Sequence, residues 1–181
     1  MTDLYDLIHT RRSIRKFTSA PVEKEKLNRI LKAALLAPSG KRTYPAEFIV
    51  VDDRKTLKAI AESKAHGAAF IQDAPWAIVI AADTGKYDVW IEDSAIAASF
   101  ILLAAENEGL GACWSQMRLR TTSDGSPATR NLKDILNLSP QHELLSVIAI
   151  GYKAENKPPH TDDDADPGRV HRNKMSAPYE F

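Results

Sequence analysis

The sequence has few of the features that would assign it to a common protein class. Cys113 is the one cysteine among 181 residues, so no disulfide can form within the chain. The 24 basic and 24 acidic residues cancel, which removes a global field that would draw the protein to nucleic acid or an anionic membrane. The chain starts with MTDLYDLIHT, which lacks the basic and apolar blocks of a signal peptide, and its longest nearly apolar run, 95–105, is too short for a membrane span. We therefore expect a soluble, cytoplasmic protein.

Motifs of several enzyme classes are missing as well. The sequence contains no P-loop, zinc-ligand spacing or nucleophile elbow, and its five histidines are scattered. The GLG at 109–111 lacks the third glycine of a dinucleotide fingerprint and follows a helical pattern instead of a strand. The acidic stretch HTDDDAD, 160–166, lacks the glycine and terminal glutamate of a calcium loop, so we expect a solvated loop. Cys113, in the apolar GACW, is expected to be a packed thiol.

The composition that is present, 44% hydrophobic and 27% charged, suits one globular domain over 1–181. Apolar residues at helical spacing predict helices at the start of the chain to Thr10, over 27–35, around 57–61 and over 126–136. Short β-branched runs predict buried strands at 47–51 and 76–82. The apolar GACW, 111–114, predicts a short strand, and ELLSVIAIGY, 143–152, predicts a further buried strand. The sum is an α+β domain with helices around a small sheet.

A longer helix is predicted after Asp93 and Ser94, which are suitable N-caps, and Gly109 supplies a left-handed stop. This helix is apolar nearly all the way round. Such a helix has to be covered on every side, either inside the fold or at a subunit interface. A dimer is therefore expected from this segment.

The segment RRSIRKF, 11–17, concentrates four cations in a chain without net charge. If it is extended, Arg11, Ser13 and Arg15 face one way and the intervening residues face the other. Two guanidinium groups beside a hydroxyl suit a phosphate or another planar anion. The alternative is a solvated basic loop.

A second cationic cluster, GRVHRNKM near the end of the chain, is placed to close over the same anion. A nucleic-acid contact is a weaker interpretation of these segments, because the chain shows no recognition helix and no aromatic stacking platform. Salt-sensitive binding of DNA or RNA by a colourless protein would favour that interpretation.

The order of these segments resembles the FMN-dependent nitroreductase family. RRSIRKF, APSGK at a helix end, an apolar helix ending in GLGACW, a VIAIGY strand and a closing GRVHRNK follow the family's order over nearly the whole chain. The resemblance implies an α/β/α sandwich with a small, mostly antiparallel central sheet. It also implies an intertwined homodimer with FMN at the subunit interface and the long apolar helix within that interface.

The resemblance further implies a set of FMN-binding residues. By position, Arg11, Arg12 and Ser13 look like ligands of the phosphate and ribityl chain, and Arg15 looks like the cation beside the pyrimidine edge. The other implied contacts are Pro38, Ser39 and Gly40 from the partner subunit, backbone groups of Gln116 and Met117 at flavin N5, and a phosphate clamp made by Arg169, Arg172 and Lys174.

The activity that the resemblance implies is ping-pong exchange, in which NADH or NADPH gives a hydride to the flavin and a nitroaromatic, quinone or similar acceptor then takes it. No side chain stands out as a general acid or base, so the named residues are binding and tuning groups. The segment RTYPAE, 42–47, departs from the family pattern at the substrate side. This departure leaves open an FMN-binding protein without turnover, such as a carrier, a sensor or a degenerate member.

Overall fold

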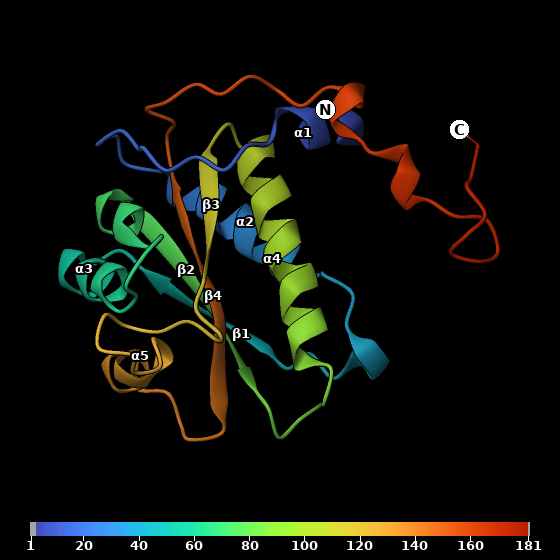
Figure 1. Ribbon diagram of the computed structural model, residues 1–181. Helices are drawn as coiled ribbons and strands as arrows, with labels where there is room; N and C mark the ends of the chain where they lie inside the picture. The colour runs from blue at the N-terminus through green and yellow to red at the C-terminus, as the bar shows by residue number, and fades with distance from the viewer. Residues whose placement is uncertain (1–2, 181) are drawn as a thin grey trace.

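The computed structural model describes residues 3–180, so Met1, Thr2 and Phe181 of the predicted domain lie outside the described part. Its centre is a four-stranded antiparallel sheet in the order β1-β2-β4-β3 (Figure 1). The strands are β1 (Ala46–Val51), β2 (Trp76–Asp83), β3 (Gly111–Gln116) and β4 (His142–Gly151). All four predicted strands are thereby confirmed, and β3 forms one edge of the sheet.

Helices cover both faces of this sheet. One face packs against α2 (Lys24–Leu35) and α4 (Trp90–Asn107), and the other packs against α3 (Arg54–Glu62) and α5 (Thr129–Ile135) (Figure 1). Each face of the sheet has its own hydrophobic core, because side chains alternate along the strands. Ile78 and Ile80 lie in the core under α2 and α4, and Val79 lies in the core under α3 and α5. The α+β fold with an α/β/α sandwich is confirmed.

The start of α4 differs from the prediction. The helix begins at Trp90 with Val89 as its N-cap, so Asp93 and Ser94 lie inside it and the predicted caps are wrong. The Asp93 carboxylate is used by a distant loop, described below, and is not available to the helix terminus. The predicted stop is confirmed, because Gly109 has φ +73° and follows the C-cap Glu108.

Only part of the α4 surface is covered. Ser94, Ala98 and Ile101 form a buried stripe against the sheet, whereas Ile96 and Phe100 are each 38% exposed on the outward side. The short helix α1 (Leu4–Thr10) contacts α4 and is itself fully on the surface. Within the described chain no helix is both long enough and apolar enough to cross a bilayer.

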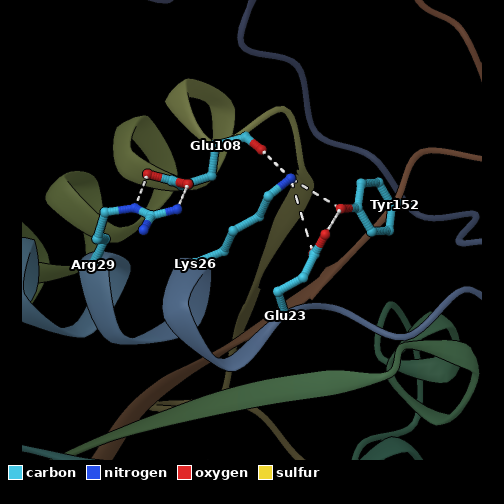
Figure 2. Close-up of polar contacts among 5 residues, drawn as sticks. All are labelled: Glu23, Lys26, Arg29, Glu108 and Tyr152. Atoms are coloured by element: carbon cyan, nitrogen blue, oxygen red, sulfur yellow. Dashed lines mark hydrogen bonds and ion pairs between the residues drawn. The ribbon is translucent and has the colours of Figure 1, made fainter.

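A polar cluster fixes the ends of α2, α4 and β4 to one another (Figure 2). Arg29 donates two hydrogen bonds to the Glu108 carboxylate at 2.7 and 2.6 Å. Lys26 donates to the Glu108 carbonyl at 3.0 Å and to the Tyr152 hydroxyl at 2.9 Å, and Tyr152 donates to Glu23. The bonds from Arg29 hold the pKa of Glu108 below its usual range. The C-terminal end of α4 is therefore linked through Lys26 to Tyr152, the residue that follows β4.

Two segments of the chain lie outside the sandwich. After β4, residues 152–160 run back beside residues 9–18, and the chain then passes through two short 3-10 turns, η3 (Asp162–Asp164) and η4 (Pro167–Arg169). The remaining residues form a C-terminal arm, 165–180, that extends away from the sheet (Figure 1).

Candidate functional site

The cationic segment 11–17 pairs with the free edge of β3 at Ala112 and then crosses the end of the sheet to Lys153, just after β4. Ser13 forms a parallel bridge with Ala112, and the Ile14 amide donates to the Ala112 carbonyl at 3.1 Å. Ile14 is only 2% exposed, whereas its neighbour Arg15 is exposed. Ile14 and Arg15 therefore point to opposite sides, as predicted, but the alternation does not continue to Lys16, which is exposed and lies beside the same hollow as Arg15.

Two glycines make this contact possible. Gly111 and Gly151 are partners in the β3–β4 register, at the end of the sheet that the segment 11–17 crosses. A Cβ atom on Gly111 would lie 2.8 Å from the Ile14 Cβ, and one on Gly151 would lie 2.6 Å from the Pro75 Cδ. Both distances are shorter than Cβ contacts normally are, so a side chain at Gly111 would push the segment off the sheet, and one at Gly151 would collide with the ring of Pro75.

Ser13 and Arg15 lie on the same side as Cys113. Burial raises the pKa of the Cys113 thiol, and the Arg15 charge and a hydrogen bond with Ser13 act in the opposite direction. Arg12 turns the other way and donates to the Pro158 carbonyl. The thiol is thus packed, and the Ser13 hydroxyl and the Arg15 guanidinium lie near it.

The Arg15 guanidinium lies over the Phe70 ring, 5.9 Å from the ring centroid. It borders an open hollow of about 630 Å³. Lys16 and Arg54 line the same hollow, where Asp73 is the acidic side chain. The excess of positive charge favours an anionic ligand on this side of the sheet.

The edge of β3 also offers main-chain groups. Because the Ala112 carbonyl points outward to Ile14, alternation places the backbone groups of Trp114 and Gln116 outward as well. The Gln116 carbonyl indeed accepts from the Lys64 Nζ at 3.0 Å. The Met117 amide instead donates inward to the Leu145 carbonyl at 3.0 Å. The structure therefore presents the Gln116 N–H at the edge and keeps the Met117 N–H inside the chain.

Lys64 lies at the end of β3, a position that the sequence did not reveal. Its ammonium group also donates to the Ser115 hydroxyl at 3.2 Å, so it lies against the last residues of β3. Burial, followed by the nearby Arg120 charge, lowers the pKa of Lys64. A lysine just after a helix carries no local pattern that would have identified it.

The loop 38–44 is held by the acid inside α4. The Asp93 carboxylate accepts from the Ser39 hydroxyl at 2.6 Å and from the Gly40 amide at 3.1 Å, and Asp93 is only 6% exposed. The Ser39 oxygen accepts in turn from the Tyr44 amide at 2.9 Å. Pro38 lines a small apolar cavity of about 160 Å³ beside this network. Asp93 thus fixes the predicted cofactor-binding loop at the start of α4.

The second cationic cluster does not reach the first within one chain. Arg169, Arg172 and Lys174 are exposed on the C-terminal arm, which leads away from the sheet (Figure 1). The arm has its own internal contacts, such as the Arg172 amide bonded to the Ala177 carbonyl at 2.7 Å. Among residues 3–180, no hydrogen bond or ion pair joins these cations to Arg11. Their predicted role therefore depends on a second copy.

The acidic loop pairs with histidines instead of gathering metal ligands. Asp162 lies 3.1 Å from the His9 ring, and Asp164 lies 3.1 Å from the His160 ring. Nowhere in the part of the chain that the structure describes do three or more histidine, cysteine or acidic side chains gather in a possible metal site. The contact between Asp162 and His9 ties the loop before the arm to α1.

A cationic segment, a hydroxyl and an outward N–H thus lie at one edge of the sheet in an α+β sandwich. The model of the nitroreductase family matches residues 8–69 and 60–152. The chain belongs to the nitroreductase family.

Individual relatives share most of their length with this chain. A protein of Methanothermobacter thermautotrophicus named as an NADH dehydrogenase/NAD(P)H nitroreductase is 40% identical over 176 residues, which are 95% of this chain and 87% of that protein. The structure of an FMN-dependent nitroreductase from Clostridium difficile R20291 is 45% identical, with a TM-score of 0.92 over 94% of this chain and 99% of that one.

A nitroreductase of Desulfovibrio desulfuricans solved in complex with FMN is more distant. It is 26% identical, with a TM-score of 0.73 over 86% of this chain and 88% of that chain. The family and fold predicted from the sequence are confirmed by these comparisons.

Proposed function

We propose that this chain is an oxidoreductase that binds FMN, takes a hydride from NADH or NADPH, and delivers it by ping-pong exchange to a nitroaromatic, quinone or similar acceptor. Family membership and the names of the relatives support the enzyme class, FMN and NAD(P)H. The observation that carries the proposal is the edge of β3, where Ser13 pairs with Ala112, Arg15 follows two residues later, and the Gln116 N–H faces outward further along the strand.

The residues present fit an FMN phosphate and ring. When bound, FMN supplies hydride acceptance and donation at N5. Arg11 and Ser13 would hold the phosphate and ribityl groups, while Arg12 fixes the segment through the Pro158 carbonyl. Arg15 would place a positive charge beside the ring, which favours the form of the ring that carries more negative charge.

The working unit that we propose is a homodimer of this domain, residues 1–181, in the cytoplasm. The outward Ile96 and Phe100 of α4 supply an apolar face for a second copy. The arm that carries Arg169, Arg172 and Lys174 would then reach the partner's phosphate site, and the loop 38–40 would reach the partner's flavin. Membrane and nucleic-acid partners are not expected.

The absorption spectrum of the purified protein tests the proposal. We expect a yellow protein that oxidises NADH or NADPH steadily only when a quinone or nitro compound is added. A yellow protein without such turnover would favour the alternative of an FMN-binding carrier or sensor. Protein that stays colourless after incubation with excess FMN would contradict both.

Arg15→Ala is expected to weaken FMN binding about 10- to 100-fold, because one charge-assisted contact is lost. It should also lower the reduction potential of the bound FMN, because the cation that favours the reduced ring is gone. Equilibrium dialysis and potentiometry measure the two effects. Lys32→Ala, which removes one exposed cation from α2, is the matched control. An Arg15→Ala protein with unaltered potential would remove Arg15 from this role.

A further inference from the structure

We propose that Glu155 is a positioning residue of the FMN site: its carboxylate fixes the backbone of Arg15 and Lys16, and its charge offsets part of the positive charge that Arg15 brings to the flavin. This inference rests on the proposed function. Nothing in the order of residues around KAENK, 153–157, points to such a role.

The tail forms a strap behind the cationic segment. The Thr18 amide donates to the Tyr152 carbonyl at 2.9 Å, and the Ala154 amide donates to the Lys16 carbonyl at 2.9 Å. Further along, the His160 amide donates to the His9 carbonyl at 2.8 Å. We call residues 152–160 the strap. Its main chain bonds to His9 at one end and to Lys16 and Thr18 at the other. Between them, at Ser13 and Arg15, side chains of the strap make the bonds.

In that middle stretch Glu155 supplies the acceptor. Its Oε1 atom accepts from the Arg15 amide at 2.5 Å and from the Lys16 amide at 3.2 Å. Two consecutive N–H groups on one carboxylate oxygen fix the direction of the chain at Arg15. The same bonds hold the pKa of Glu155 below its usual range, with the Arg15 amide as the largest cause, so the group is an anion at neutral pH.

Lys157 completes the arrangement. Its ammonium group lies 3.7 Å from the Glu155 carboxylate and donates to the Ser13 carbonyl. The two strap side chains thus hold Ser13 and Arg15 through main-chain atoms only. Neither contact uses the hydroxyl of Ser13 or the guanidinium of Arg15, which lies over the Phe70 ring beside the hollow.

Geometry and charge are separable at Glu155. Glutamine has the same shape and keeps an oxygen that accepts from both amides, but it carries no charge. A purely structural role would change the affinity for oxidised and reduced FMN equally, and would leave the reduction potential where it is. A role through charge changes the ratio of the two affinities, because the reduced ring is the more negative form.

The experiment compares Glu155→Gln, Glu155→Ala and Glu25→Gln with the wild type. Glu25 is an exposed acid on α2, so its variant is a control for loss of one surface charge. The readouts are the dissociation constant of oxidised FMN, by fluorescence quenching, and the midpoint potential of the bound FMN, measured against reference dyes.

We expect the affinity of Glu155→Gln for oxidised FMN to lie within about threefold of the wild-type value. The ratio of its affinities for reduced and oxidised FMN should rise by about three- to tenfold, a modest change because solvent screens the partly exposed strap. A tenfold change in this ratio is about 30 mV toward positive potential for a two-electron couple. Glu155→Ala should weaken oxidised FMN at least about tenfold, because two amides lose their acceptor.

Two results would overturn the inference. One is a Glu155→Gln potential equal to that of Glu25→Gln, which shows that the flavin does not sense the charge. The other is a Glu155→Ala protein with wild-type affinity, which shows that the bonds do not position the site. If Glu155→Ala fails to fold, the Glu155→Gln potential alone decides. A wild type that binds no FMN would overturn the proposed function as well, whereas a yellow, active wild type with insensitive Glu155 variants overturns this inference alone.

Discussion

Replacing Ile96 and Phe100 together by glutamate is expected to give a folded monomer that retains no FMN. In the single chain both side chains are 38% exposed on the outward side of α4, so charges there meet water and leave the sheet-facing stripe intact. In the proposed dimer the same charges would be buried without partners, at a cost of several kcal/mol for each ion. Subunit association should therefore be lost, and a site built from two chains should be lost with it.

Sedimentation equilibrium and the FMN content of the purified protein measure this result. Ile135→Glu is the matched control, because Ile135 is 46% exposed on α5, on the opposite face of the sheet. The control should remain a yellow dimer. A double variant that is still dimeric with full FMN content would show that this face of α4 is not the interface.

Gly111→Ala is expected to destabilise the protein by about 2–3 kcal/mol and to weaken FMN binding more than about tenfold. The added Cβ would lie 2.8 Å from both the Cβ and the Cγ2 of Ile14. Neither side can move freely, because Ile14 is buried and its amide is bonded to the Ala112 carbonyl. Relief of the clash therefore displaces the segment that carries Ser13 and Arg15.

Urea unfolding of the FMN-free protein followed by FMN titration separates the two effects. Gly125→Ala is a suitable comparison, because nothing lies within 4 Å of an added Cβ there and φ is +85°. That variant should lose about 1 kcal/mol through left-handed strain and keep its FMN affinity. A Gly111→Ala protein as stable as wild type would mean that the segment does not depend on the close approach.

Most of the fold follows from local patterns. Apolar runs identify the four strands, most directly β2 and β4, which are almost entirely buried, and helical spacing identifies α2 and α3 because each has one apolar face. The start of α4 does not follow, because Val89 is a poor cap and Asp93 is a good one. The loop at Ser39 and Gly40 takes the Asp93 carboxylate, and this tertiary contact overrides the local preference.

The site is less accessible to sequence reasoning than the fold. Strand alternation predicts which way Ser13 and Arg15 face, since that depends only on extended geometry. Asp93 and Glu155 act on residues 54 and 140 positions away, and no local pattern encodes such contacts. The roles of the arm residues and of the loop 38–40 stay predictions, because they need a second chain.

The hydrogen-bond donor that β3 presents at position 116 belongs to the main chain, so it does not depend on the identity of the residue there. Almost any side chain can replace Gln116 without removing the amide hydrogen, whereas proline has none to offer. Insertion of one residue between Ala112 and Gln116 would reverse the parity of the strand and turn that hydrogen toward β4. The length of this stretch, more than its composition, is what selection has to preserve.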